Sequence, residues 1–250
     1  YTAWWQKDSK LSAPLNSNLK TVMDFSFFDK INTAKNEQTE TWFKGLDRVY
    51  NNFVYDFLYP DPTSVLAFIE NHDTDRFLGE GDNLPMLKQA STLLLTTRRI
   101  PQLYYGTEIM MNGVKSKSDG YVRKDFPGGW SDDKANALTA AGRTKLQNEC
   151  YNFYKTLLNW RKGNEVIAKG NMTQFMVQHG VYAYARQYNG KTVFVMLNGT
   201  DEATTLPLKY YKEILKDHAQ GKDILTGRII NLDGELTMSP RESLVIEIFP

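Results

Sequence analysis

The densest group of polar side chains in the sequence covers residues 70–75, directly after an apolar stretch at residues 64–69. It contains Asn71, His72 and Asp73. A carboxylate at the end of a strand can act as an acid or base, bind sugar hydroxyls, or stabilise a developing positive charge. A plain structural role suits the same residues, with Asp73 capping the next turn and His72 merely exposed. The residue types alone leave both interpretations open.

A second polar group follows a later apolar stretch. Residues 100–106 have the pattern of a strand, and Tyr105 and Glu108 stand at its end. Further along the chain, Asp119 and Arg123 are four residues apart. On spacing alone, these two charges form an ordinary exposed ion pair in a loop. Beside other polar groups at strand ends, they are also candidates for a binding site.

Strand-like and helix-like segments alternate over the first two thirds of the chain. The expected strands cover residues 19–25, 64–70 and 100–106. The expected helices cover residues 40–56, a segment beginning near Asn83, and residues 143–162, where Thr144 and Gln147 have capping-box spacing. This order predicts a (β/α) barrel or a doubly wound sheet. A complete eightfold barrel takes about 250 residues, so the roughly 160 residues here predict an open sheet or part of a barrel.

The pattern of apolar residues changes at about residue 166. Small and large side chains alternate over residues 181–186, and glycine turns such as Asn189-Gly190 separate the strand-like segments. A period of two with short turns is typical of antiparallel sheets. The sequence therefore predicts two domains, a partial (β/α) barrel at residues 1–165 and a β-sandwich at residues 166–250.

Composition excludes several classes of protein. The 30 Lys and Arg nearly balance the 29 Asp and Glu, so an electrostatic grip on nucleic acid is not expected. Apolar residues make up 41% of the chain, enough for a core, and no run approaches the roughly 18 apolar residues of a membrane span. The single cysteine, Cys150, allows no disulfide within the chain. No HExxH metal motif and no glycine-rich phosphate loop occurs, so neither a metal site nor nucleotide binding is expected.

Several segments, in order, resemble the α-amylase superfamily of glycoside hydrolases. Asn71-His72-Asp73 after an apolar strand resembles the family's fourth sequence motif, and residues 100–108 resemble its strand-eight motif. Asp119 and Arg123 match its Asp-x-x-x-Arg substrate loop, and a terminal β-sandwich is its domain C. Asp125-Phe126-Pro127-Gly128-Gly129-Trp130 is similar to the neopullulanase/cyclomaltodextrinase branch. Together these motifs cover most of the chain.

The resemblance implies a fold and a role for each candidate residue. The three strands become strands six, seven and eight of a (β/α)8 barrel. Asp73 becomes the carboxylate that stabilises the transition state, while His72, Asp119 and Arg123 bind sugar. Supporting positions around the site fall to Asn71, Tyr105 and Glu108. One departure is Arg99, which stands where the family usually has glycine before strand eight.

The resemblance also implies that the chain is part of a longer enzyme. The family's nucleophile and acid/base follow strands four and five, which this chain does not contain, so the chain alone is expected to be inactive. Its open sheet edges predict pairing with the missing N-terminal part or self-association. No cofactor is expected in this chain, and calcium belongs to a domain of the complete enzyme that lies outside it. The compartment stays undecided, with a periplasmic or extracellular location slightly favoured by the resemblance.

Three functions compete at this point. The first is the C-terminal part of a retaining hydrolase acting on α-1,4-glucosidic bonds in starch, pullulan or cyclodextrins. The second is a non-catalytic carbohydrate-binding or interaction protein built on the same fold. The third, an unrelated α/β domain with a β appendage, is disfavoured by the ordered motifs. The sequence upstream of Tyr1 would separate the first two, because it holds or lacks the other two carboxylates.

Overall fold

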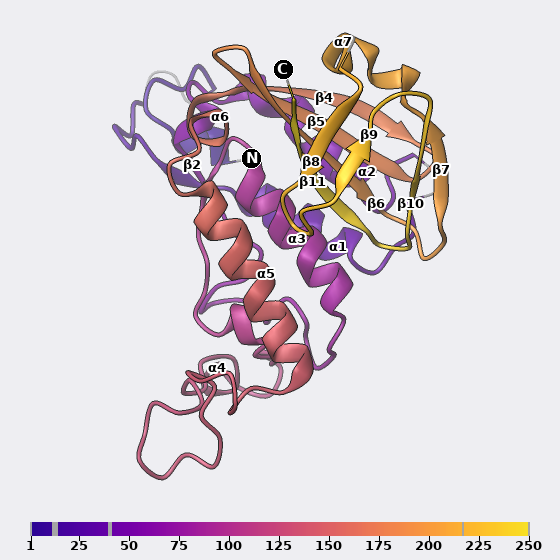
Figure 1. The fold of residues 1–250 in the computed structure, drawn as a ribbon. Helices are drawn as coiled ribbons and strands as arrows, with labels where there is room; N and C mark the ends of the chain where they lie inside the picture. The colour runs from indigo at the N-terminus through magenta and orange to yellow at the C-terminus, as the bar shows by residue number, and fades with distance from the viewer. Residues whose placement is uncertain (1, 12–14, 40–41, 217, 250) are drawn as a thin grey trace.

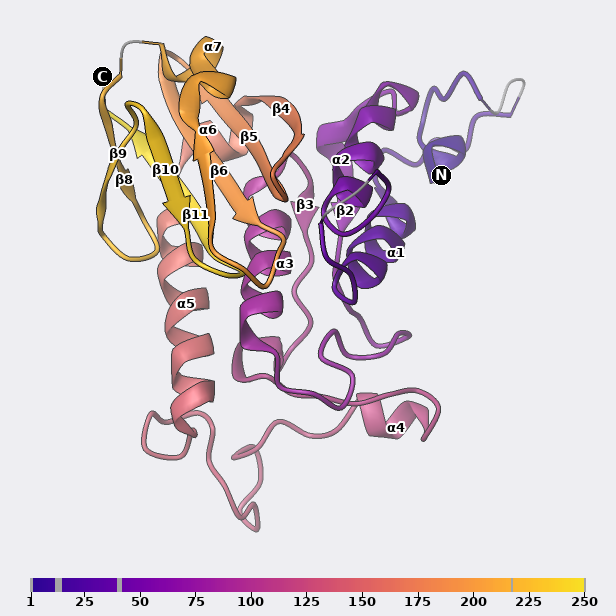
Figure 2. The same cartoon turned by 90° about the vertical axis from the view of Figure 1, so that its right-hand side faces the viewer.

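The fold combines a small parallel sheet, a set of helices and a larger antiparallel sheet (Figure 1). The structure is a computed structural model that describes residues 2–11, 15–39, 42–216 and 218–249. The antiparallel strands gather at one end, and the loop carrying α4 (Asp119–Val122) projects at the other. Helices α3 (Leu84–Thr96) and α5 (Lys145–Arg161) run side by side between these ends (Figures 1 and 2).

The parallel sheet contains the three expected strands. They are β1 (Val22–Met23), β2 (Val65–Ala67) and β3 (Ile100–Pro101), in the order β1-β2-β3. Both pairs are parallel, with Leu66 between Met23 and Ile100. The strands are shorter than the apolar runs that predicted them, because polar caps and turns begin at once. The 3-10 helices in the part of the chain that contains these strands are η1 (Thr2–Trp5), η2 (Tyr55–Leu58), η3 (Pro62–Ser64) and η4 (Thr107–Ile109).

The sequence did not predict α1 (Phe25–Ala34). Asp24, expected at the end of a strand, caps this helix by accepting the backbone N–H of Phe27 at 2.9 Å. The helix expected over residues 40–56 is α2 (Asp47–Val54), with residues 40 and 41 outside the described part of the chain. Phe43 and Gly45 have positive φ angles, which delay the helix. Trp42 is therefore exposed instead of lying on a buried helix face.

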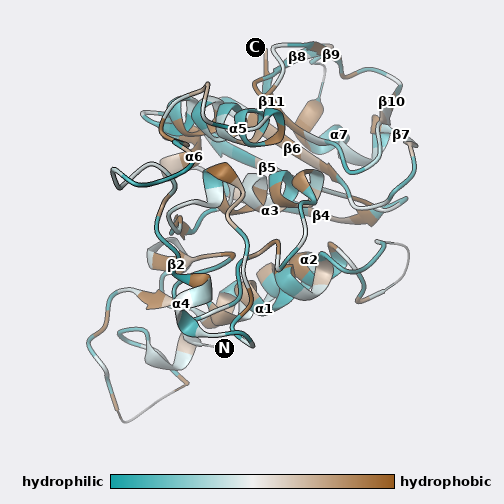
Figure 3. Cartoon of the chain, turned by 90° about the horizontal axis from the view of Figure 1, so that it is seen from below, coloured by the Kyte–Doolittle hydropathy of each residue, from teal (hydrophilic) through white to brown (hydrophobic). Residues whose placement is uncertain are grey.

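The caps of α3 and α5 are as predicted. Asn83 accepts the backbone N–H of Met86 at the start of α3. Thr144 and Gln147 form the complete capping box of α5. Cys150, Phe153, Tyr154 and Leu157 give α5 its buried face, whereas Leu146 is exposed. Seen from below, α1 and α2 lie together, apart from this second pair of helices (Figure 3).

The remaining strands form two antiparallel sheets. The six-stranded sheet has the order β4-β5-β6-β11-β8-β9, and β10 pairs with β7 in the second sheet. Their bounds are β4 (Asn171–Gln178), β5 (Val181–Tyr188), β6 (Lys191–Asn198), β7 (Thr204–Pro207), β8 (Gln220–Asp223), β9 (Ile229–Asn231), β10 (Glu235–Met238) and β11 (Ser243–Ile248). Short helices α6 (Glu165–Lys169), η5 (Leu208–Tyr211) and α7 (Lys212–Leu215) complete the fold. The expected division at 165/166 falls within α6.

Strand β5 is buried on both faces, which joins the sheet to the helices. Val181, Ala183 and Ala185 lie in the core between the two sheets. Tyr182 and Tyr184 lie in the other core, which α3 and α5 share. The sheet thus packs against the barrel helices instead of presenting a polar outer face at this strand.

Buried Arg186 extends this junction. Its guanidinium donates to the carbonyl oxygens of Thr96 at 2.8 Å, Ile167 at 2.9 Å and Gly170 at 2.8 Å. These are C-terminal carbonyls of α3 and α6, where a cation is favoured. Burial lowers the pKa of Arg186 to about 10.

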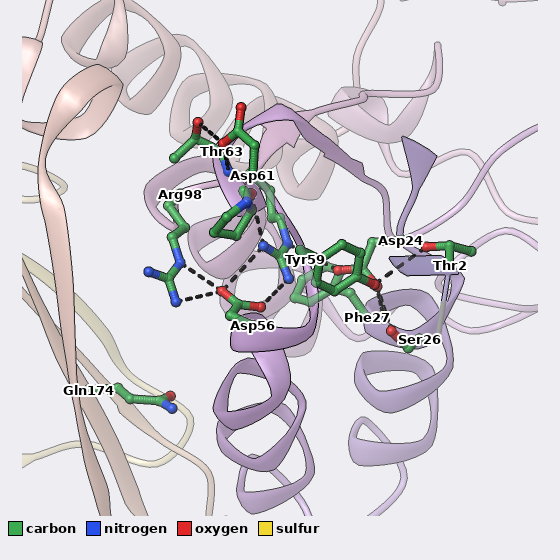
Figure 4. Close-up of polar contacts among 12 residues, drawn as sticks. Thr2, Asp24, Ser26, Phe27, Asp56, Tyr59, Asp61, Thr63, Arg98 and Gln174 are labelled. Atoms are coloured by element: carbon green, nitrogen blue, oxygen red, sulfur yellow. Dashed lines mark hydrogen bonds and ion pairs between the residues drawn. The ribbon is translucent and has the colours of Figure 1, made fainter. Parts of the chain in front are cut away.

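Arg99, the departure from the family pattern, is buried in an ion-pair network. Its guanidinium pairs with Asp24 at 3.0 Å and with Asp56, and it donates to the carbonyl of Pro62 at 2.9 Å. Arg98 adds a second cation to Asp56, donating its Nε to the carboxylate at 2.7 Å (Figure 4). The backbone of Arg99 has no positive φ, so the turn into β3 does not require glycine. The network accounts for an arginine at this position.

None of the described helices is both long and apolar enough to cross a membrane.

Candidate functional site

The turn after β2 carries the first two candidate residues. Asn71 is buried, and its side-chain oxygen accepts the backbone N–H of Asp73 at 2.8 Å. Thr74 closes the turn by accepting the backbone N–H of Asn71 at 2.9 Å. This leaves the side chains of His72 and Asp73 exposed, at 62% and 63%. Asn71 therefore shapes the turn that carries His72 and Asp73.

Arg123 brings the four predicted site residues together. Its Nε donates to the carbonyl of His72 at 2.8 Å, and its Nη2 lies 3.1 Å from both Asp73 Oδ1 and Asp119 Oδ2. His72 Nε2 lies 3.3 Å from Asp73 Oδ2. The loop ion pair that spacing alone predicted exists, and it extends to the turn after β2. We refer to His72, Asp73, Asp119 and Arg123 as the Asp73 cluster.

Sequence reasoning missed Lys115, which joins the same cluster. Its Nζ lies 3.0 Å from the carbonyl of Asp73 and 3.3 Å from Asp119 Oδ1. Its backbone N–H donates to Asp75 at 2.6 Å. Lys115 has the same four-residue spacing from Asp119 as Arg123 does, but its contact with Asp73 spans 42 positions in the sequence. Lys115 and Arg123 together balance the charges of Asp73 and Asp119.

Of the two remaining candidate residues, Tyr105 contacts the chain beside the Asp73 cluster and Glu108 does not. Tyr105 is exposed and donates its hydroxyl to the carbonyl of Lys124 at 2.6 Å, next to the Asp119–Arg123 loop. Glu108 lies in η4, near Cys150. Among the described residues, no hydrogen bond or ion pair joins Glu108 to the Asp73 cluster. Burial, reinforced by the charges of Glu108 and Glu149, raises the pKa of the Cys150 thiol to about 12.

A buried ion pair lies beneath the cluster and was also missed. Arg76 and Glu70 are both buried, with Nη1 3.2 Å from Oε1. Burial raises the pKa of Glu70, opposed by hydrogen bonds from Thr107 and the backbone of Phe77 and by the charge of Arg76. The guanidinium also lies 4.0 Å from the ring centre of Tyr104. The two opposite charges flank Asn71-His72-Asp73 in the sequence, but residue type does not show that they are buried and paired.

Among the described residues, the Asp73 cluster is neither a metal centre nor part of the cavity beside α2. Over residues 2–11, 15–39, 42–216 and 218–249, no group of three His, Cys, Asp or Glu side chains is arranged to hold a metal ion. A cavity of about 950 Å³ lies elsewhere, between the chain before α2 and the β4–β5 turn. Trp42, Met176 and Asp201 line it. The Asp73 cluster instead lies on an open surface at the carboxyl end of the strands.

Known proteins match both the C-terminal residues and most of the length of the chain. Residues 172–247 match the family model of the cyclo-malto-dextrinase C-terminal domain. The chain is 30% identical over 217 residues to a cyclomaltodextrin glucanotransferase of Thermoanaerobacterium thermosulfurigenes, covering 84% of the chain and 28% of the relative. It is 28% identical over 220 residues to an α-amylase of Niallia circulans, covering 85% of the chain and 38% of the relative.

A solved structure extends the likeness to the whole fold. The α-amylase of Geobacillus thermoleovorans, solved in complex with acarbose, superposes with a TM-score of 0.74 at 20% identity. The superposition covers 94% of this chain and 49% of that one. The chain thus spans less than half the length of these proteins.

These matches, together with the strand order, identify the fold. It is the C-terminal part of a (β/α)8 barrel followed by an antiparallel β-sandwich, as predicted. The chain belongs to the α-amylase family and corresponds to its C-terminal region.

Proposed function

We propose that the chain is the C-terminal part of an α-glucan hydrolase that cleaves α-1,4-glucosidic bonds with retention. In this proposal Asp73 supplies the carboxylate that stabilises the transition state. The observation that carries it is the single guanidinium of Arg123 joining Asp73, Asp119 and the His72 main chain. Barrel enzymes carry their active sites at the carboxyl ends of the strands, which is where the exposed charges of the Asp73 cluster lie.

Each member of the cluster has a chemical task in this proposal. Retaining cleavage passes through an oxocarbenium-like transition state that is helped by ring distortion and by hydrogen bonds to sugar hydroxyls. Asp73 grips hydroxyls of the sugar at the cleavage point, and His72 donates to the same sugar. As a nearby anion, Asp73 also favours the protonated form of the acid catalyst. Asp119 and Arg123 bind a glucose further toward the non-reducing end.

Within the family, we propose the neopullulanase/cyclomaltodextrinase branch. The matched domain model at residues 172–247 and the segment at residues 125–130 support this assignment. Transfer of the glycosyl group to another sugar is a second candidate, favoured by the 30% identity to a glucanotransferase. Product analysis after incubation of the complete enzyme with maltotriose separates the two. Glucose and maltose without longer products indicate hydrolysis, whereas longer or cyclic products formed together with glucose or maltose indicate transfer.

The last part of the proposal concerns this chain without the rest of the barrel. We propose that it is inactive alone and that its open sheet binds the N-terminal part of the barrel or a second copy. The outer strand β3 supports this, because Ile100 and the neighbouring Leu103 are exposed apolar residues beside an unpaired edge. Light scattering of the purified chain is expected to show association, and incubation with cyclodextrin is expected to release no sugar. A monomer that hydrolyses cyclodextrin would contradict both parts.

The experiment that tests the catalytic proposal uses the complete enzyme with Asp73→Asn. The exchange keeps the shape of the side chain and removes the negative charge. We expect kcat to fall by about 10²-fold or more with a much smaller change in KM, because the interaction strengthens in the transition state. Asp82→Asn, at an exposed position outside the cluster, serves as the control and should keep kcat.

The outcome also separates an enzyme from a non-catalytic binding protein. If the complete protein has no glycosidase activity but binds maltotriose, and Asp73→Asn weakens that binding, the binding protein is the correct function. If Asp73→Asn keeps its kcat in an active enzyme, the role assigned to Asp73 is wrong.

A further inference from the structure

We propose that Arg76 is a positioning residue that holds in register the three segments forming the glucan site. This inference rests on the function proposed for the Asp73 cluster. The segments are the turn after β2, the end of β3 with its following residues, and the loop that carries Asp119 and Arg123. Arg76 itself is fully buried, so it acts on the sugar only through the residues it holds.

The guanidinium of Arg76 contacts each of these segments. Its Nε donates to the carbonyl of Val122 at 3.0 Å, directly before Arg123. Its Nη1 donates to the carbonyl of Tyr105 at 2.7 Å and pairs with Glu70 at 3.2 Å. Two carbonyls and one carboxylate from separate segments of the chain thus converge on one side chain. Movement of Arg76 would shift the backbone on both sides of the cluster.

Glu70 fixes the position of Arg76 from below. Its carboxylate also accepts the backbone N–H of Phe77 and the hydroxyl of Thr107. The ends of the turn, at Glu70 and Phe77, are therefore tied together beneath Asp73. Thr107 adds the start of η4 to the same carboxylate. The buried pair closes the turn as a rigid unit.

The backbone around Arg76 brings the second loop close. The N–H of Arg76 donates to the carbonyl of Gly113 at 3.0 Å, and the N–H of Gly113 donates to the carbonyl of Gly79 at 2.7 Å. A Cβ on Gly113 would lie 2.7 Å from the carbonyl oxygen of Tyr121, closer than real contacts allow. The loop carrying Arg123 therefore packs on Gly113, whose backbone is bonded to the segment that follows the turn. Because these contacts are between backbone atoms, a small shift of the backbone at Arg76 would also shift the loop that carries Arg123.

Only a guanidinium has the geometry for these contacts. Its planar fork donates in several fixed directions at once, whereas the ammonium of lysine is a single point charge. The guanidinium carbon also lies 4.0 Å from the ring centre of Tyr104 and 4.9 Å from that of Tyr105. The remaining Nη2 is buried with no hydrogen-bond partner among the described residues. The bonds to the carbonyls of Val122 and Tyr105, in two separate segments beside the Asp73 cluster, point to positioning.

The test compares Arg76→Lys with Arg99→Lys in the complete enzyme. Both exchanges keep a positive charge in a buried ion pair, and both are expected to lower the unfolding temperature. Of the two arginines, Arg76 alone touches the site segments. We expect kcat, measured well below unfolding and per folded molecule, to fall by about 10-fold or more for Arg76→Lys, as small misplacements of catalytic groups do. Arg99→Lys should keep kcat within about twofold, since it leaves these contacts intact.

A double-mutant cycle with Asp73→Asn separates positioning from general destabilisation. If Arg76 acts through Asp73, adding Arg76→Lys to Asp73→Asn should lower kcat by less than about twofold. Multiplicative effects of the two exchanges, or a normal kcat for Arg76→Lys, would overturn the proposal. If Arg76→Lys does not fold, Glu70→Gln replaces it in the cycle, with the same expectation and the same contrary result. A normal kcat for Asp73→Asn alone would instead contradict the proposed function.

Discussion

Two arginines in this molecule each join two aspartates, in opposite surroundings. Arg123 joins Asp73 and Asp119 on an open surface, with its side chain 39% exposed. Arg99 joins Asp24 and Asp56, and its own side chain has no exposed surface. Exposed ion pairs contribute about 0–1 kcal/mol to stability, whereas removing one partner of a buried pair costs about 3–5 kcal/mol. The same residue types therefore serve stability in one place and remain available to a ligand in the other.

The positions of the two clusters on the strands agree with this difference. Arg99 directly precedes β3, and Pro62, whose carbonyl it binds, precedes β2. The Asp73 cluster instead follows β2 and β3. In barrel enzymes the carboxyl ends of the strands carry the chemistry and the amino ends carry stability. Burial and position along the strands thus agree: both fit a stabilising role for the Arg99 network and the binding role proposed for the Asp73 cluster.

The largest expected effect comes from breaking the buried cluster. In the 250-residue chain, Arg99→Met leaves Asp56 with Arg98 alone and removes the cation that pairs with buried Asp24, which we expect to lower the free energy of unfolding by about 3–5 kcal/mol. Urea unfolding followed by circular dichroism measures the change. Arg123→Met is the matched exchange in the exposed cluster and should change it by less than about 1 kcal/mol. Equal losses for the two variants would remove the distinction between the clusters.

The next effect concerns sugar binding by the exposed cluster. In the complete enzyme, Arg123→Met should raise KM for maltooligosaccharides by about 10-fold, because a charged hydrogen-bond partner of the bound sugar is lost. The change in kcat should be smaller, since Arg123 is assigned to a glucose away from the cleavage point. Steady-state kinetics give both constants. Arg228→Met, which removes an exposed pair with Glu242 on the β-sheet domain, is the control and should alter neither.

The smallest effect comes from an ion pair of intermediate burial. Arg48 donates two hydrogen bonds of 2.7 Å to Glu37, and these bonds are the main cause of the lowered pKa of that carboxyl. Since the folded pKa lies below the unfolded value of 4.5, the stabilisation is present above pH 4.5 and is lost as the pH falls through the folded pKa. The urea midpoints of the wild-type chain and Glu37→Gln should therefore differ at neutral pH and converge in acid. A difference that is constant with pH would show that the Glu37 charge is not responsible.

The sequence predicted those parts of the fold that local signals determine. The cap at Asn83, the capping box at Thr144 and the glycine turn at Asn189-Gly190 appear as expected, because each depends on residues close together in the chain. Helix α1 was missed because its cap, Asp24, was assigned to a strand end. The burial of β5 on both faces was missed for another reason. Helix α3, which helps to cover its second face, lies far earlier in the chain, so no local pattern marks the contact.

The candidate site divides in the same way. His72, Asp73, Asp119 and Arg123 were singled out because they follow predicted strands and lie in segments that resemble motifs of the α-amylase family. Lys115 and Arg76 were missed although each stands near a chosen residue in the sequence, because only the fold shows that Lys115 contacts Asp73 and that Arg76 contacts Val122 and Tyr105. Burial cannot be read from residue type, so nothing in the sequence distinguished Arg76 from an exposed arginine.

The most direct test of the central claim is a crystal structure of the complete enzyme with acarbose, the ligand bound in the related α-amylase. The account predicts that sugar hydroxyls lie within hydrogen-bond distance, about 3 Å, of Asp73 and His72, with a neighbouring ring against Asp119 and Arg123. Arg99 should make no contact with the sugar, because its side chain is buried at the opposite ends of the strands. Acarbose bound in a productive cleft that leaves Asp73 without a sugar contact would contradict the account.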